Sequence, residues 1–304
     1  MDIQEVISQI VVLFILLAVG YAAGKASVLT PDTGKVLTKL LLRITMPCTI
    51  LSTVIGGDVT ISGGETAYFM LMVLLAFAIY FLIALPAARA LGGDKTNIGL
   101  HGFMVVFGNV GFMGFPMAQA IFGPESAFYV ALFNIIFVIL IFSVGIVMVS
   151  GKGGKLDPRV LMTPTFFASL LVIPIAITGF RAPTVIDGAI RLIGSVTTPC
   201  SMLIIGITMS QISIKDAFSE WRLYPIAFLK LIVIPIVTWL VLRQFVTNEL
   251  VLGVLTLLSA MPTAAMAAMF AIEYKGNEHI ASSGIFLTTL ISGATIPLIM
   301  FLLL

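Results

Sequence analysis

The chain has 304 residues, of which 60% are hydrophobic and 10% are charged, and its formal net charge is +2. A soluble domain carries about 25% charged residues, so this composition excludes an ordinary soluble protein. It indicates an integral membrane protein that crosses the bilayer several times. With so small a net charge and no basic run, nucleic acid is not an expected partner.

Ten apolar stretches are long enough to cross a bilayer, which predicts an all-α integral membrane fold. The segment Met1–Glu5 has acidic residues and no basic ones, so the first stretch is expected to be a retained span rather than a signal peptide. The ten spans are expected at about residues 5–24, 34–55, 66–90, 98–122, 125–149, 161–180, 184–210, 221–245, 249–275 and 279–304.

The positions of Lys and Arg predict the orientation of the spans, because cytoplasmic links are enriched in both. Most of these side chains fall in the links after the odd-numbered spans, for example in the loop at 151–159. This bias places that loop in the cytoplasm and both termini outside.

An internal repeat links the second and seventh spans. The segment Thr45–Leu51 reads TMPCTIL, and half a chain length later Thr197–Leu203 reads TTPCSML. The chain therefore divides into five spans at 1–150 and five at 151–304, and an odd number of spans per copy gives the two copies opposite orientations. Inverted repeats are typical of secondary transporters. The alternative is a chance likeness between two apolar helices.

Two spans contain residues that interrupt helices. Span 4 includes Gly108–Pro116, with three glycines and a proline, and span 9 includes the matching segment Ser259–Met266 around Pro262. Glycine costs about 1 kcal/mol and proline about 3 kcal/mol inside a helix. Broken spans at matching positions of two repeats favour a binding site at their crossing. The alternative is a proline kink with glycines that allow close helix packing.

The breaks predict an anion site. Proline suits the first position of a helix, so Pro116 and Pro262 are each expected to begin a second half-helix. Helix starts have unpaired N–H groups and the positive end of the dipole, which suits a small carboxylate, although a neutral substrate is the alternative. The expected substrate-binding residues are Asn109, Gly111, Gly114, Pro116, Asn134, Ser259, Pro262 and Thr263.

Three polar side chains lie well inside spans, and each has two interpretations. Asn134 in span 5 is either a substrate ligand or a partner in an interhelical hydrogen bond. Lys230 in span 8 has either a gating or substrate-attracting role, or a structural or snorkelling role, where snorkelling means that its ammonium extends toward the cytoplasmic surface. Arg43 in span 2 has the same two interpretations.

The sequence gives no sign of catalysis or of a bound cofactor. Cys48 and Cys200 lack the spacing of a metal site, and no motif of paired catalytic residues occurs. No Asp or Glu lies clearly in the middle of a span, so coupling to sodium or protons is not indicated. Backbone carbonyls at broken helices leave sodium as an alternative.

The segment Gly108–Pro116 resembles the span-4 signature of the auxin efflux carrier family. The Pro47-Cys48 and Pro199-Cys200 pairs and Met261–Thr263 resemble other recurrent positions of that family, and the likeness covers essentially the whole chain. The chain lacks the long central loop of many plant members, and is similar in form to compact bacterial members described as malonate or other dicarboxylate transporters.

The resemblance implies a fold shared with bile-acid sodium symporters. Spans 1, 2, 6 and 7 would form a scaffold that is often dimeric, and spans 3–5 and 8–10 a moving domain in which spans 4 and 9 cross. Asn134 matches a carboxylate-binding asparagine of plant members. Here Phe115 and Met117 flank Pro116, where plant members have asparagines, so auxin itself is not the expected substrate.

These observations together predict a carrier that moves a small organic anion, a mono- or dicarboxylate, by alternating access. The alternative is an anion channel or a membrane sensor with the same fold. A channel needs a continuous polar path, whereas the polar residues here cluster around the two breaks.

Overall fold

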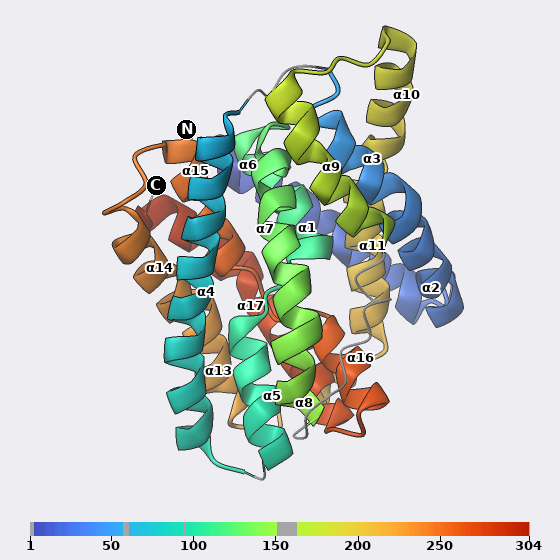
Figure 1. Cartoon of the computed structure of the whole chain (residues 1–304). Helices are drawn as coiled ribbons and strands as arrows, with labels where there is room; N and C mark the ends of the chain where they lie inside the picture. The colour runs from blue at the N-terminus through green and yellow to red at the C-terminus, as the bar shows by residue number, and fades with distance from the viewer. Residues whose placement is uncertain (1–2, 57–60, 94, 151–162, 304) are drawn as a thin grey trace. The chain divides into compact units, whose positions relative to one another are not determined.

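The chain folds into helices joined by short connections (Figure 1). The computed structural model describes residues 3–56, 61–93, 95–150 and 163–303, and among these the only β-pairing is an isolated bridge. The loop at 151–159, which we expect in the cytoplasm, lies outside the described residues. Six helices among the described residues are long and apolar enough to cross a membrane: Val6–Lys25, Gly63–Leu91, Ser126–Ser150, Thr184–Ser210, Leu223–Leu242 and Glu278–Leu303.

The other four expected spans are shorter or interrupted. The second is a helical run in three pieces, α2 (Pro31–Leu40), η1 (Leu41–Thr45) and α3 (Met46–Ser52), and the sixth is α9 (Pro164–Thr178). The fourth and ninth are each broken in two. The all-helical membrane fold is therefore confirmed, whereas the ten spans and their inverted repeat stay predictions.

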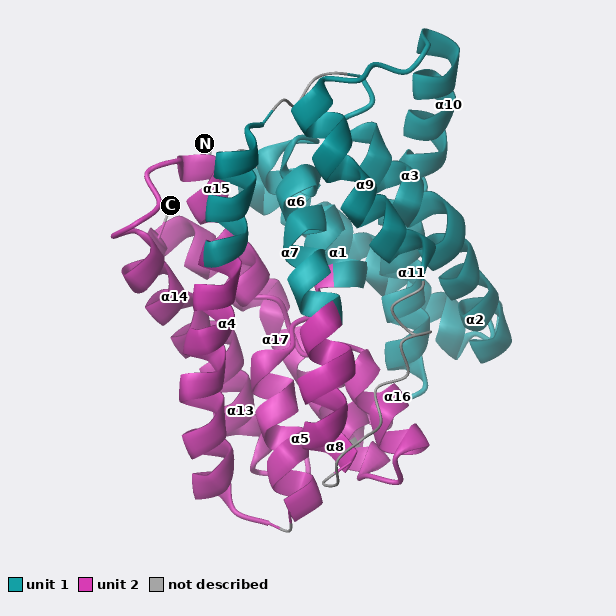
Figure 2. Ribbon diagram, viewed as in Figure 1, with its two compact units in different colours: residues 1–71, 111–138, 158–211 teal, residues 72–110, 139–157, 212–304 magenta. Residues whose placement is uncertain are grey.

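Residue contacts divide the chain into two compact units (Figure 2). Unit 1 is residues 1–71, 111–138 and 158–211, and unit 2 is residues 72–110, 139–157 and 212–304. The further helices of unit 1 are α1 (Ile3–Lys25), α6 (Phe115–Phe122), α10 (Thr184–Ser195) and α11 (Thr197–Ser210). Three helices contribute residues to both units: α4 (Gly63–Leu91), η2 (Val110–Gly114) and α7 (Ser126–Leu140).

Unit 2 contains the remaining helices. They are α5 (Lys95–Val106), η3 (Ile141–Gly145), α8 (Ile146–Ser150), α12 (Ile214–Ala217), α13 (Leu223–Phe228), η5 (Leu229–Val233), α14 (Ile234–Leu242), α15 (Glu249–Ser259), α16 (Met266–Glu273) and α17 (Glu278–Leu303).

Prolines inside the helical runs explain three of the π-helical turns. The turn η1 ends two residues before Pro47, η2 (Val110–Gly114) two residues before Pro116, and η5 two residues before Pro235. Proline has no N–H and its ring clashes with the carbonyl four residues earlier. A wider turn relieves that clash, so the helix continues through the proline instead of ending there.

Close packing in unit 1 depends on glycines that let two backbones approach. A Cβ atom at Gly20 of α1 would lie 2.6 Å from the carbonyl oxygen of Leu203 in α11, and one at Gly206 of α11 would lie 2.7 Å from the carbonyl carbon of Gly20. Small residues commonly permit such contacts between membrane helices, where apolar side chains gain little by leaving lipid.

We expect Gly206→Val to destabilise the protein, because the added side chain must separate α1 from α11. Overpacking of this kind costs about 1–3 kcal/mol or more. Thermal unfolding in detergent measures the loss. Gly188→Val is the matched control, since nothing lies within 4 Å of a Cβ atom at Gly188 on the exposed part of α10. Equal melting temperatures for the two variants would contradict the close α1–α11 contact.

The two copies of the repeated motif meet inside unit 1. The Thr49 hydroxyl lies 2.7 Å from the Thr197 hydroxyl and donates to the carbonyl of Gly194 at 2.9 Å. Both threonines are buried. A Cβ atom at Gly194 would lie 3.0 Å from the Thr49 nitrogen, so a glycine is needed for this contact. These hydrogen bonds hold α3 against α10 and α11.

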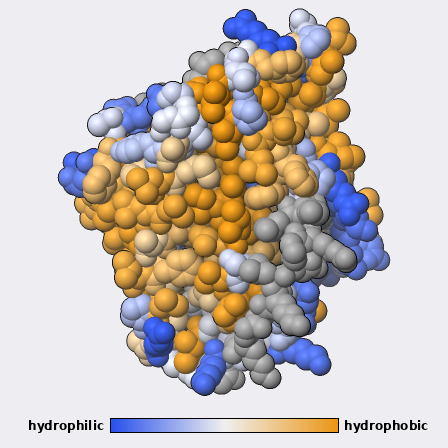
Figure 3. Space-filling view, viewed as in Figure 1, coloured by the Kyte–Doolittle hydropathy of each residue, from blue (hydrophilic) through white to orange (hydrophobic). Residues whose placement is uncertain are grey.

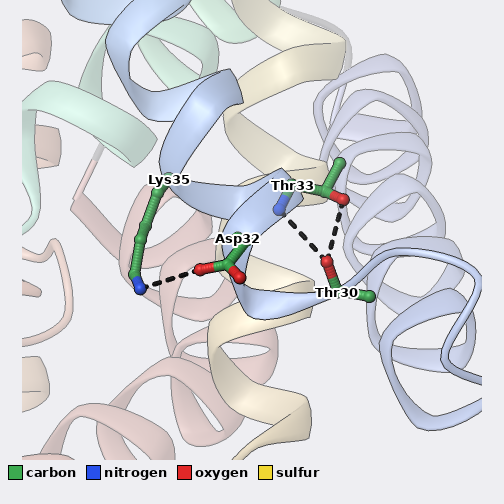
Figure 4. Close-up of polar contacts among 4 residues, drawn as sticks. All are labelled: Thr30, Asp32, Thr33 and Lys35. Carbon is green, nitrogen blue, oxygen red and sulfur yellow. Dashed lines mark hydrogen bonds and ion pairs between the residues drawn. The ribbon is translucent and has the colours of Figure 1, made fainter.

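Polar side chains fix the start of α2 (Figure 4). The Thr30 hydroxyl accepts from the Thr33 N–H at 3.3 Å, and Pro31 takes the first helical position. Lys35 donates to Asp32 at 2.9 Å, and this ammonium lowers the pKa of the Asp32 carboxyl from its ordinary value. Both side chains are exposed, so the pair contributes little stability.

Exposed apolar side chains form the surface expected to face lipid. Along α1 they recur every four residues, which places Ile7, Val11, Ile15 and Val19 on one stripe of the helix. On the face drawn in Figure 3, hydrophobic residues cover most of the centre, and hydrophilic groups lie around its margins.

Candidate functional site

The two broken spans meet in an antiparallel β-bridge inside unit 2. The helix α5 ends at Val106 and η2 begins at Val110, while α15 ends at Ser259 and α16 begins at Met266. Gly108 pairs with Thr263. The Asn109 N–H donates to the Pro262 carbonyl at 2.7 Å, and the Ala264 N–H donates to the Phe107 carbonyl at 2.9 Å. We call residues 107–109 and 262–264 the crossing.

Glycine at position 108 is required by the close approach of the second break. A Cβ atom there would lie 3.1 Å from the Met261 Cβ, 3.3 Å from the Met261 carbonyl oxygen and 3.2 Å from the Lys230 Nζ. Contacts this short leave no room for a larger residue unless a neighbour moves. The absence of a side chain at Gly108 therefore lets the strands pair and brings the lysine to the crossing.

The prolines do not begin the second half-helices, so that prediction is wrong. The helical path η2–α6 begins at Val110, and Pro116 lies near the start of α6, after the π-helical turn. Pro262 lies in the crossing itself, four residues before α16 begins at Met266. The π-helical turn relieves the clash that would otherwise end the helix at Pro116.

Backbone and hydroxyl donors at the crossing are largely used within the protein. Besides the two bridge bonds, the Val110 N–H donates to the Gly108 carbonyl at 2.9 Å, and the Thr263 N–H to the Thr288 hydroxyl of α17 at 3.1 Å. The Thr263 hydroxyl donates to the Met104 carbonyl at 3.1 Å, and the Ser259 hydroxyl to the Thr256 carbonyl at 2.6 Å. Thr263 therefore ties the crossing to α5 and α17, whereas the Ser259 hydroxyl bonds within its own helix α15.

The helix ends at the crossing largely cancel one another. The helices α5 and α15 present their C-terminal, negative ends there, and η2 and α16 present their N-terminal, positive ends. Each end is equivalent to about half an elementary charge. Two negative and two positive ends leave almost no net charge, so the backbone alone does not make the crossing cationic.

Lys230, when protonated, supplies a net charge. It lies in η5, its side chain is 0% exposed, and its Nζ atom has no hydrogen-bond partner among the described residues. The ammonium lies 5.6 Å from the centre of the Tyr80 ring, a cation–π contact. Full burial contradicts the alternative in which this side chain extends to the cytoplasmic surface.

An unpaired ammonium in a buried site is costly, so such groups in membrane proteins are usually functional. Among the residues whose burial the structure describes, Lys230 is the only Asp, Glu, Lys or Arg that is buried. No ion pair found among the described residues involves it. An anionic ligand at the crossing would provide the missing countercharge.

Asn109 is the other side chain at the crossing that remains available. It is 4% exposed, and its side-chain amide has no hydrogen bond to any residue that the structure describes. It follows Gly108, whose Cβ position is next to the lysine ammonium. An amide and an ammonium are suitable donors for one carboxylate.

The other expected site residues belong to unit 1. Asn134 is 5% exposed and donates to the Ser169 hydroxyl of α9 at 3.4 Å, the interhelical hydrogen bond of its second interpretation. Arg43 is exposed in η1. Gly111, Gly114 and Pro116 lie in the η2–α6 run. A binding role for Asn134, Gly111, Gly114 and Pro116, and a gating or charge role for Arg43, stay predictions.

Sequence reasoning missed two features of this site. The first is Tyr80, which is 1% exposed in the middle of α4. Tyrosines of membrane helices concentrate at the interfaces, so a tyrosine in the middle of a span could have indicated a functional position. The second feature is an aromatic cluster of Phe77, Tyr80, Phe81, Phe103 and Phe107, whose neighbouring rings lie 4.8–6.2 Å apart. In a sequence this apolar, such phenylalanines cannot be told from lipid-facing ones.

Comparison with known proteins places this chain in a transporter family. A family model described as "Membrane transport protein" matches residues 5–300. An "Uncharacterized transporter" of Methanothermobacter thermautotrophicus is 24% identical over 289 residues, covering 93% of this chain and 94% of that protein. A transporter of Methanocaldococcus jannaschii, also named as uncharacterized, is 25% identical over 301 residues, which cover 95% of this chain and 96% of that protein.

A third relative has a substrate in its name. The protein of Rhizobium meliloti named "Putative malonate transporter" is 25% identical over 240 residues, which cover 75% of this chain and 73% of that protein. Because the family model covers nearly the whole chain, the protein belongs to the membrane transport protein family, the auxin efflux carrier family that its motifs resemble.

Proposed function

We propose that the protein is a secondary transporter that carries a small organic anion, a mono- or dicarboxylate, by alternating access. The observation that carries this proposal is the buried, unpaired Lys230 ammonium next to the crossing. A carboxylate that accepts from Lys230 and Asn109 would neutralise this charge. The name of the Rhizobium meliloti relative supports a carboxylate as the substrate class.

The finer architecture is part of this proposal. It consists of ten spans in two inverted repeats, at 1–150 and 151–304, with both termini outside in the bacterial inner membrane. Spans 1, 2, 6 and 7 would form a scaffold through which two copies associate as a homodimer, and spans 3–5 and 8–10 would move. The broken α5–η2 and α15–α16 paths support the crossed arrangement of spans 4 and 9.

Flux into proteoliposomes tests the proposal. We expect saturable uptake of at least one member of a panel of mono- and dicarboxylates, above that of protein-free liposomes. Uptake should be stimulated by the same anion inside, because a carrier exchanges its ligand across the membrane. Sodium, pH and membrane potential should be varied independently. Conductance without such counterflow would favour the anion channel, and no flux of any carboxylate would contradict the proposed function.

We expect Asn109→Ala to raise the apparent KM of the transported carboxylate about tenfold or more while expression is kept. A hydrogen bond to a charged group contributes about 1.5–3 kcal/mol, which corresponds to this range. Uptake over a series of concentrations measures the change. Asn248→Ala is the comparison variant, since that asparagine caps α15 on the exposed surface. An unchanged KM for Asn109→Ala would remove this residue from the site.

A further inference from the structure

We propose that the site selects anions with a single negative charge, so that a dicarboxylate is carried in its singly protonated form. This inference rests on the proposed function and deepens it, because it identifies the charge state of the substrate. It follows from the number of charges at the crossing and from what surrounds them.

With Lys230 protonated, the crossing offers one positive charge. Lys230 is the only buried Asp, Glu, Lys or Arg among residues with described burial, and its ammonium has no partner there. The four helix ends cancel, as two negative and two positive termini meet at the crossing. A ligand with one carboxylate therefore leaves the occupied site neutral.

A second ionised carboxylate would have no cation to meet. The bridge bonds and the bond to Thr288 use the N–H groups of Asn109, Thr263 and Ala264. The surrounding side chains include the buried aromatic residues Phe77, Phe103 and Phe107. Burying an unpaired carboxylate in such surroundings costs more free energy than protonating it near neutral pH. The site therefore accepts the second carboxyl in its protonated, neutral form.

The test compares a dicarboxylate with its own half ester. Malonate has two ionisable carboxyls. Monomethyl malonate is a molecule of nearly the same size in which one carboxyl is kept and the other is blocked as an ester. Uptake into proteoliposomes is measured with equal pH on both sides, from about pH 6 to about pH 8. Protein-free and Lys230→Met proteoliposomes give the passive background. The half ester also corrects for changes of the protein itself with pH, because both compounds meet the same protein at each pH.

We expect uptake of malonate, divided by that of the half ester, to fall about tenfold for each pH unit above the second pKa of malonate. The half ester should be transported at every pH. A ratio that stays constant with pH, or malonate uptake without uptake of the half ester, would overturn charge selection and leave the carrier intact.

The panel provides the same comparison with other ligands if malonate is not carried. Succinate and its monomethyl ester then replace malonate and monomethyl malonate. Any transported monocarboxylate serves as a further ligand with a single charge. The absence of flux for every carboxylate would count against the proposed function itself, whereas pH-independent flux of a dianion would count only against the selection of a single charge.

Discussion

Lys230→Met is expected to abolish uptake of the transported anion while the protein remains folded. Methionine has nearly the length of lysine without its charge, so the packing of η5 is kept. Removing one partner of a buried charge pair costs about 2–5 kcal/mol of binding, or about 30-fold or more in affinity. Uptake in proteoliposomes at several substrate concentrations measures the loss.

The stability of this variant separates a binding role from a structural one. The ammonium has no partner among the described residues when the ligand is absent, so replacing it with an apolar group should leave the melting temperature unchanged or raise it. A lysine with a structural role would give the opposite result, a lower melting temperature. Lys230→Arg, which keeps the charge on a larger group, should retain more uptake than Lys230→Met.

Gly108→Val is expected to reduce uptake to background, because the new side chain must occupy space taken by Met261 and the Lys230 ammonium. Overpacking should also lower stability by about 1–3 kcal/mol. Gly108→Ala should have uptake and stability between those of Gly108→Val and the native protein, since its methyl group is smaller yet still meets the Met261 Cβ at 3.1 Å and the Lys230 Nζ at 3.2 Å. Uptake and thermal unfolding of the same preparations measure both effects.

The control for this substitution is Gly188→Val, where a Cβ atom meets nothing within 4 Å. It should keep both uptake and melting temperature. If Gly108→Val transported as well as Gly188→Val, the strands of the crossing would not need their close approach, and the position assigned to Lys230 would be wrong.

The sequence predicted the breaks because backbone chemistry determines them locally. Gly108 and Pro262 each disfavour a continuous helix, and both lie outside the helices of the structure. The same reasoning was wrong about where the second halves begin. Helix η2 starts at Val110, because a π-helical turn accommodates Pro116, and the need for such a turn is not apparent from a proline alone.

The environment of Lys230 could not be read from the sequence. Its position along span 8 is compatible with an ammonium that extends toward water and with one that turns inward, because the side chain spans several ångströms. The choice depends on Gly108 and Tyr80, which come from other parts of the chain. Pro235 contributes as well, since the turn that precedes it contains the lysine.

The anion site stays a prediction, and the structure changes the chemistry that we expect of it. Unpaired backbone N–H groups were expected to hold the ligand, yet those of Asn109 and Ala264 are used in the β-bridge. Such pairing between distant segments depends on the tertiary fold, so local patterns give no sign of it. The lysine therefore becomes the principal ligand of the proposal and Asn109 the second.

Equilibrium binding to the purified protein tests the central claim most directly. A radiolabelled carboxylate that the protein transports is titrated onto the native protein and onto Lys230→Met in detergent, at the same pH and ionic strength. We predict saturable binding to the native protein and a loss of affinity of about 30-fold or more in the variant. Equal affinity for the two proteins would contradict an anion site built around the Lys230 ammonium.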